Sequence, residues 1–265
     1  MNDNLTNEIK ENGIIKIENF LSPEELIKLI NIVNFYKVPK GDKESIFLTN
    51  LKVLSIKLFK FKFRSLLHTY ELAKFKKNKK LDQIAKDFFN KQVNSNYIDG
   101  YYSKVGNKDI LPWHTDQSYS GSKKSDAKFY NPDNFYLKFF IYLTNVSSNN
   151  GCMSYIPKTH KIAYEIRKGI YNKEISYQPY WSLKDFRNIV KNNINFLHKK
   201  MDNEIIENFL KNTEFEDSMN ASNKYDYNAT AGTMIVFDEG GIHRGSKPSL
   251  NDRMVIRYLI KPSSN

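Results

Sequence analysis

Residues 112–117 read PWHTDQ, and this short motif says more about the chain than any other. It places the imidazole of His114 and the carboxylate of Asp116 two residues apart in a segment with strand character. Side chains at positions i and i+2 of a strand point to the same face of the sheet. A ring nitrogen and a carboxylate oxygen can therefore reach one common point, which could hold a divalent metal if a third ligand came from elsewhere.

His243 offers that third ligand far downstream, within GGIHRG at residues 240–245. Two histidines and one carboxylate, with three open coordination positions, form the facial arrangement of non-haem Fe(II) oxygenases. An isolated His-x-Asp more often marks a turn or a surface pair, so its companions matter. Ten residues after His243 comes Arg253, in the strand-like run 253–260. Its guanidinium can bind the far carboxylate of a dicarboxylic co-substrate through two hydrogen bonds.

With this order of motifs the sequence resembles the phytanoyl-CoA dioxygenase family. Residues 12–26 look like the opening strand and first helix of that family. Residues 139–146 and the run NGCMSYIPKTHK at 150–161 look like its core strand pair and the corner that follows. Segments 45–110 and 162–228 have no specific match.

The resemblance implies an Fe(II)- and 2-oxoglutarate-dependent dioxygenase. His114, Asp116 and His243 would hold Fe(II), 2-oxoglutarate would chelate the metal and pair with Arg253, and O2 would take the last position. The implied reaction hydroxylates an unactivated C–H bond and releases succinate and CO2. Halogenation is not expected, because a halide needs the coordination position that the carboxylate of Asp116 fills.

Three further residues near the motifs are candidate contacts of the co-substrate. Tyr102 and Lys104 share one face of the strand before the metal motif, where the family often places such a contact. Simple surface exposure is an equal interpretation of both. Ser246 follows His243 closely and is expected either to bind the co-substrate carboxylate or to stabilise a turn.

The remaining candidates concern the substrate and the co-substrate partner. Gln117 and Tyr119 are expected to face the substrate. Arg257 shares a strand face with Arg253 and is the alternative partner of the co-substrate carboxylate. Trp113 is expected to pack in the core.

The pattern of short strands separated by Gly and Asn turns predicts a jelly roll. The resemblance implies a mainly β fold with flanking helices around a double-stranded β-helix, or cupin-like, core. The expected strands are residues 13–20, 97–105, 114–117, 135–146, 151–157, 231–238 and 253–261. The expected helices are 23–36, 46–80 and 81–93. In 46–80 the alternation of Phe with Lys or Arg over residues 59–64 also suits a strand, and helix is preferred. Ser22 and Glu25 form a capping box at the start of the first of these helices.

One domain over residues 1–265 is expected, because single β domains reach this size. Residues 20–95 form its helical N-terminal part. Residues 162–228 are too many for a structureless loop, so we expect a helical insertion that covers the open end of the barrel as a lid and sets substrate specificity.

Bulk composition indicates a soluble, cytoplasmic protein. No apolar run is long enough to span a membrane, and the first residues lack a signal-peptide pattern. The single cysteine, Cys152, excludes an internal disulfide and fits a reducing compartment. We expect it to be a small buried core residue.

The formal net charge of +12 raises the question of an anionic partner. Residues 52–80 contain ten Lys or Arg and one acid, Glu71. A nucleotide, a coenzyme A or carrier-protein arm, or a nucleic-acid backbone would suit such a segment. We favour solvated surface lysines, because arginine is scarce there and no nucleic-acid motif accompanies them.

Two classes of function remain. The favoured one is a dioxygenase that hydroxylates a small, polar or anionic metabolite, with an acyl-CoA or carrier-bound substrate as the alternative. The other class is a non-catalytic jelly-roll module that binds an anionic ligand. Neither nucleic acid nor a membrane is expected as a partner.

Overall fold

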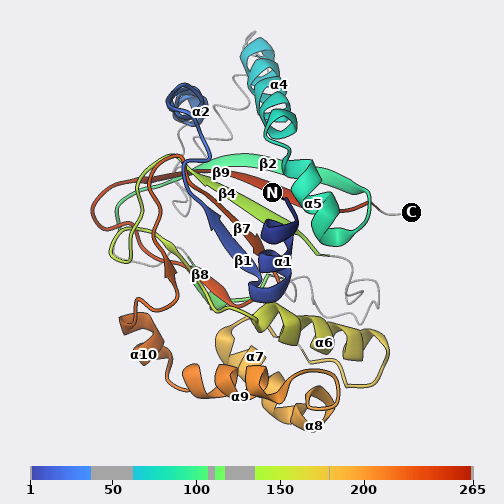
Figure 1. The fold of residues 1–265 in the computed structure, drawn as a ribbon. Helices are drawn as coiled ribbons and strands as arrows, with labels where there is room; N and C mark the ends of the chain where they lie inside the picture. The colour runs from blue at the N-terminus through green and yellow to red at the C-terminus, as the bar shows by residue number, and fades with distance from the viewer. Residues whose placement is uncertain (1, 37–61, 107–110, 117–134, 179, 264–265) are drawn as a thin grey trace.

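Two facing antiparallel sheets form the centre of the protein, in a computed structural model that describes residues 2–36, 62–106, 111–116, 135–178 and 180–263. The larger sheet has the order β1-β7-β4-β9-β2, and the smaller has the order β3-β8-β5-β6 (Figure 1). The larger sheet consists of β1 (Ile14–Ile17), β2 (Val93–Ser103), β4 (Leu137–Tyr142), β7 (Met234–Asp238) and β9 (Arg253–Pro262). The smaller consists of β3 (Leu111–His114), β5 (Met153–Tyr155), β6 (Asp226–Tyr227) and β8 (His243–Gly245). This arrangement confirms the expected mainly β fold, although within the described ranges the sheets do not close into a barrel.

Strand β4 separates the two sides of the larger sheet. Its odd-numbered residues, from Leu137 to Ile141, join an apolar cluster with the helices α1 (Asn2–Asn12), α2 (Pro23–Tyr36) and α5 (Leu81–Phe89). Its even-numbered residues face the smaller sheet, where Phe140 and Tyr142 pack with Met153 and Tyr155. Lys138 lies on this inner face too, because successive side chains of a strand alternate. A cation is therefore buried between the sheets.

The N-terminal helices largely follow the sequence signals. Glu25 accepts a hydrogen bond from the backbone of Ser22, whose hydroxyl accepts one from the backbone of Glu25, so the predicted capping box is present. Helix α4 (Lys62–Asn78) confirms the choice of helix for the described part of segment 46–80. Helix α5 ends at Phe89, and β2 already begins at Val93, so the predicted helix 81–93 was too long.

The segment between β5 and β6 is helical, as expected, and starts slightly earlier than predicted. It contains α6 (Thr159–Tyr171), α7 (Leu183–Asn192), α8 (Ile194–Leu197), α9 (Asn203–Asn212) and α10 (Glu216–Ala221). These helices gather at the bottom of Figure 1, beside β8. They share a separate apolar core with Trp113, Ile156 and Ile242, which flank the metal-motif strands. The insertion thus packs directly on the segments that carry the candidate ligands.

One expected strand was wrong, and one helix was not predicted at all. Strand β3 ends at His114, so Asp116 lies in the bend after the strand and does not share a strand face with His114. Helix α1 was not predicted, because residues 2–12 are polar and their burial depends on contacts with α5 and β1.

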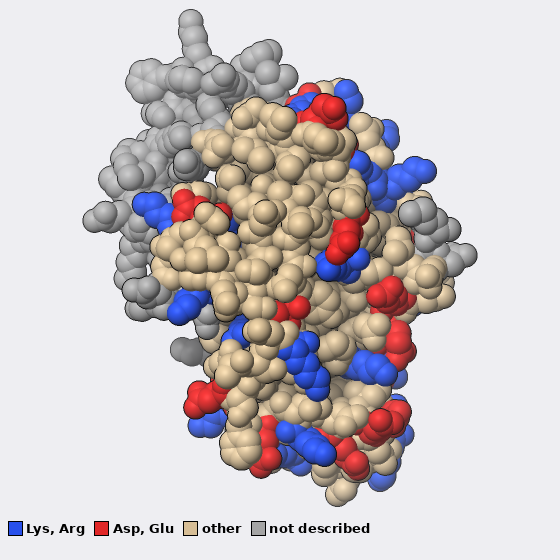
Figure 2. All heavy atoms as spheres, turned by 60° about the vertical axis from the view of Figure 1, so that its left-hand side comes forward, with Lys and Arg blue, Asp and Glu red and all other residues tan. Residues whose placement is uncertain are grey.

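Charges of both signs are mixed over one face of the protein. Figure 2 shows Lys and Arg next to Asp and Glu across the lower half of that face. Ion pairs occur on the described surface, such as Lys161 with Glu11 at 2.6 Å and Lys200 with Glu174 at 3.1 Å. Within the described ranges, no helix is both long and apolar enough to span a membrane.

Gly13 provides a test of how α1 joins the sheet. It ends α1 with a left-handed φ of 79°, and an added Cβ would lie 2.4 Å from both Nδ1 of His160 and the hydroxyl of Tyr155. Gly13→Ala should lower the free energy of unfolding by roughly 2–4 kcal/mol, because it combines left-handed strain with overpacking. Urea denaturation measures this, and Gly106→Ala is the control, since a Cβ there meets nothing closer than 3.8 Å. Equal effects of the two changes would contradict this packing.

Candidate metal centre

Backbone pairing places the two histidines side by side. His114 is the last residue of β3, His243 is the first of β8, and the two are direct partners in the antiparallel register. The backbone N–H of Asp116 donates to the carbonyl of Glu239 at 3.1 Å, and the hydroxyl of Thr115 donates to the carbonyl of Gly240 at 2.9 Å. The segment that follows β3 is therefore fixed to the segment that precedes β8.

Three ligand atoms converge at this point. One side-chain atom each from His114, Asp116 and His243 lies within 4.8 Å of the other two. Nε2 of His243 is 3.2 Å from Oδ2 of Asp116, and Nε2 of His114 is 3.6 Å from Oδ1. The imidazole centroids are 4.3 Å apart.

Backbone carbonyls orient both imidazoles. Nδ1 of His114 lies 2.6 Å from the carbonyl of Pro112, and Nδ1 of His243 lies 2.8 Å from the carbonyl of Gly241. A carbonyl accepts only, so each Nδ1 carries the proton and each Nε2 presents a lone pair. Nε2 of His114 is buried and has no hydrogen-bond partner in the described part of the chain. A metal-bound histidine typically donates its other ring N–H to a carbonyl or carboxylate, as both Nδ1 atoms do here. The donor set therefore fits a divalent metal.

The electrostatics also favour the metal-binding protonation states. Burial favours the neutral form of Asp116, but the ammonium of Lys138 outweighs it and, with the two histidines close by, holds the pKa of the carboxyl well below its usual range. Burial, together with repulsion from His114, lowers the pKa of His243. A carboxylate and a neutral imidazole are the forms that ligate a metal.

Sequence reasoning missed Lys138 and Glu239. Nζ of Lys138 forms an ion pair with Oδ2 of Asp116 and lies 3.4 Å from Oε2 of Glu239. Burial opposes the charge of Lys138, but the two carboxylates outweigh it and raise the pKa of the ammonium. The signal was present in the sequence, since a lysine interrupts the apolar strand LKFFIY at residues 137–142.

A small cavity of about 70 Å³ extends inward from the candidate ligands. Its charged lining consists of Asp116 and four cations: Lys138, Arg244, Arg253 and Arg257. Arg253 is buried, and Nη1 donates to the carbonyl of Gly151 at 2.9 Å. Arg257 faces the same cavity from the same strand, as its spacing indicated. The structure thus brings both candidate arginines and the three candidate ligands into one site.

The other candidates for the co-substrate do not line this cavity. The hydroxyl of Tyr102 donates to Asp252, which precedes Arg253, and Lys104 is exposed. Ser246 is buried and donates to the carbonyl of Cys152 at 2.7 Å, next to the Gly151 carbonyl that Arg253 contacts. Tyr102 and Ser246 therefore brace the chain around Arg253. Gln117 and Tyr119 lie outside the described residues.

Arg244 connects the helical insertion with the metal strands. Its guanidinium lies 4.9 Å from the ring centroid of Trp113 and contacts Asn220 of α10. Trp113 donates to the same Asn220 oxygen at 3.0 Å. On the other side, the ring of Trp181 lies 4.9 Å from that of His114. Residues of the insertion therefore contact Trp113, His114 and Arg244, which lie in or beside the metal motif.

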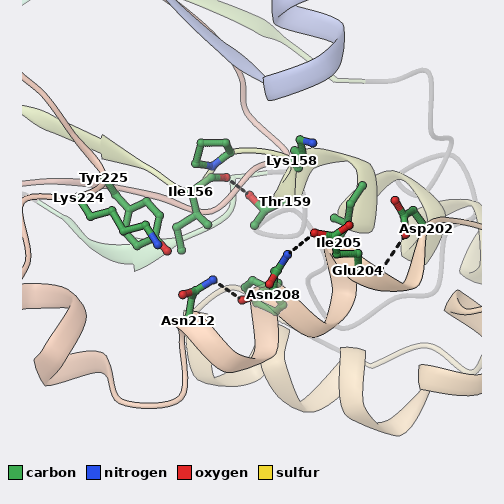
Figure 3. A pocket seen from close by; sticks show the side chains of 12 residues that line it. Ile156, Lys158, Thr159, Asp202, Glu204, Ile205, Asn208, Asn212, Lys224 and Tyr225 are labelled. Carbon is green, nitrogen blue, oxygen red and sulfur yellow. Dashed lines mark hydrogen bonds between the residues drawn. The ribbon is translucent and has the colours of Figure 1, made fainter.

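A second hollow, of about 370 Å³, lies between α9 and the corner after β5 (Figure 3). The Thr159 hydroxyl at its wall accepts a hydrogen bond from the backbone of Ile242 at 2.8 Å. Asn208 and Asn212 project from α9 on the opposite side. This hollow is separate from the cavity that contains the candidate ligands.

Fold and site together define a protein of two facing β-sheets with a candidate metal centre of two histidines and one aspartate. The family model for phytanoyl-CoA dioxygenase (PhyH) matches residues 9–247. The chain therefore belongs to the phytanoyl-CoA dioxygenase family. This confirms the resemblance inferred from the motifs.

Solved structures show the same fold at low sequence identity. The non-haem α-ketoglutarate-dependent carbocyclase SnoK from nogalamycin biosynthesis matches with a TM-score of 0.55 and 13% identity, over 97% of this chain and 82% of SnoK. The non-haem α-ketoglutarate-dependent epimerase SnoN from the same biosynthesis matches with a TM-score of 0.53 and 9% identity, over 99% of this chain and 84% of SnoN. EctD from S. alaskensis, in its apoform, matches with a TM-score of 0.56 and 13% identity, over 98% of this chain and 76% of EctD. No curated protein matches the chain.

Asp116 provides the test of the metal centre. Asp116→Asn should weaken Co(II) binding by more than roughly 100-fold, the upper range for residues that only support a ligand. Isothermal titration calorimetry measures this against Asp87→Asn, a change on α5 that leaves the site intact. Equal affinity of the two variants would exclude Asp116 as a ligand.

Proposed function

We propose that this chain is a non-haem Fe(II)- and 2-oxoglutarate-dependent dioxygenase that hydroxylates an unactivated C–H bond of a small anionic metabolite. The observation that carries the proposal is the convergence of His114, Asp116 and His243 on the wall of a cationic cavity. Family membership supports the reaction class. The fold alone would not, since its structural neighbours include an epimerase and a carbocyclase.

His114, Asp116 and His243 would hold Fe(II) through two neutral Nε2 atoms and one carboxylate. When bound, the metal would activate O2, so that 2-oxoglutarate, O2 and R–H become succinate, CO2 and R–OH. The protein's part is to fix the three ligands on one face and leave the opposite positions open. The buried Arg253, on the cavity wall, would pair with the distal carboxylate of 2-oxoglutarate.

Absorption spectroscopy tests this reaction class. Anaerobic addition of Fe(II) and 2-oxoglutarate to the apoprotein should produce the weak visible charge-transfer band of the chelate. The same titration of Asp116→Asn should produce none, because the iron would be lost. A well-folded protein without the band would favour the second candidate, a non-catalytic module whose cationic cavity binds an anion.

Arg253 and Arg257 form a matched pair for assigning the co-substrate contact. Removing one partner of a buried charge pair typically costs about 2–5 kcal/mol, or roughly 30- to several-thousand-fold in affinity. Arg253→Ala should therefore raise the Kd for 2-oxoglutarate by this factor and leave Co(II) affinity nearly unchanged. A large effect of Arg257→Ala together with a small effect of Arg253→Ala would reverse the assignment.

The substrate proposal depends on charge. Four cations and one carboxylate line the cavity, and a fixed positive field favours and accelerates the entry of an anion. Lys76 on α4, Lys80 in the turn after it and Lys86 on α5 border a separate groove of about 600 Å³ that would suit an acyl-CoA or carrier-bound substrate. We prefer the small anion because its proposed binding groups lie beside the ligands.

A substrate panel distinguishes these classes. We expect succinate release above the uncoupled background with organic acids, acidic amino acids or nucleotides, and less with acyl thioesters or neutral apolar compounds. The product should gain one oxygen atom and no chlorine in chloride buffer, because Asp116 keeps its carboxylate. Turnover confined to apolar compounds would contradict the substrate class, and a chlorinated product would contradict hydroxylation.

A further inference from the structure

Lys138 contacts the candidate metal centre from a position that the proposed chemistry has not yet used. Its side chain is 7% exposed and projects from β4 into the space between the sheets. There its ammonium meets two carboxylates, Oδ2 of the partly exposed Asp116 and, at 3.4 Å, Oε2 of the buried Glu239. Buried charges are stable only when they are paired, so these three groups form one connected unit.

Glu239 fixes where the ammonium lies. Its Oε1 accepts a hydrogen bond from the backbone of Tyr136 at 2.9 Å, which anchors the carboxylate to the start of β4. Its backbone carbonyl accepts from Asp116 at 3.1 Å. The same residue therefore positions both Lys138 and the backbone of the candidate ligand. Lys138 cannot leave Asp116 without losing part of this arrangement.

The two oxygens of Asp116 consequently have different surroundings. Oδ2 is in contact with Lys138 and lies 3.2 Å from Nε2 of His243, whereas Oδ1 lies 3.6 Å from Nε2 of His114 and has no ammonium against it within the described part of the chain. A carboxylate oxygen held by an ammonium is a poorer metal ligand, because the cation draws on the same lone pairs and repels a second cation. We infer that Lys138 is a positioning residue that limits Asp116 to a single bond with the metal.

This inference rests on the proposed function and explains how coordination positions stay open. Three protein bonds leave three of six positions, which a chelating 2-oxoglutarate and O2 would fill. A second bond from Asp116 would leave only two. Lys138, held by Glu239, would therefore protect the binding of the co-substrate more than the binding of the metal.

Calorimetry with Co(II), followed by 2-oxoglutarate on the Co(II)-loaded protein, tests this role. Lys138→Met should retain Co(II) affinity but weaken 2-oxoglutarate binding by roughly 10- to 100-fold, the range for residues that orient a metal ligand. The visible absorption of Co(II) should change as well, because its coordination changes. Lys138→Arg keeps the charge and should preserve most of the 2-oxoglutarate affinity. Lys161→Met removes a lysine that pairs with Glu11 on α1 and is the control.

The outcomes separate this inference from the proposed function. If the wild-type protein bound neither Co(II) nor 2-oxoglutarate, both the proposed function and the role of Lys138 would be contradicted. If the wild type binds both, an unchanged 2-oxoglutarate affinity and Co(II) spectrum in Lys138→Met would overturn the inference alone. Loss of Co(II) binding in a well-folded Lys138→Met would also overturn it, because Lys138 would then hold the whole ligand set. Should that variant not fold, Glu239→Gln must weaken 2-oxoglutarate binding in the same direction, and no change would overturn the inference.

Discussion

The antiparallel pairing of β3 with β8 is the constraint on which the site depends. It sets His114 directly opposite His243, although 129 positions separate the two in the sequence. Backbone carbonyls at Pro112 and Gly241 then orient both rings in the same way. No long-range side-chain contact is needed for this orientation, because each carbonyl belongs to the residue two positions before its histidine. The strand register alone therefore brings two correctly oriented imidazoles together.

Buried charge is the second organising feature. Lys138 and Glu239 are buried and pair with each other, and Lys138 pairs with the partly exposed Asp116; an unpaired buried ion would be strongly destabilising. Their mutual pairing keeps Asp116 ionised and gives it one preferred orientation. The cavity lining, with four cations and one carboxylate, differs from the mixed charges on the face in Figure 2. This contrast supports a role for the cavity, and not for the net charge of the chain, in anion binding.

The sequence was sufficient for the candidate ligands and for the family, because ligand types and spacing are local properties. It was insufficient for the geometry of Asp116, because the strand ends at His114 and the backbone of Asp116 is held by a hydrogen bond to the distant carbonyl of Glu239. Lys138 was missed because the apolar residues of strand LKFFIY predict a core position, and the one lysine among them was not considered separately. Contact with the co-substrate stays a prediction for Tyr102 and Ser246. Neither lines the cavity, and their hydrogen bonds hold the chain around Arg253.

Crystallography of the Fe(II)-loaded protein, with anomalous data collected on both sides of the iron absorption edge, tests the central claim most directly. The account predicts one strong anomalous peak, bonded to Nε2 of His114, Nε2 of His243 and one oxygen of Asp116, with Lys138 still against the other oxygen. A peak bonded through Nδ1 atoms would contradict it. So would an ion at other residues while these three remain unliganded.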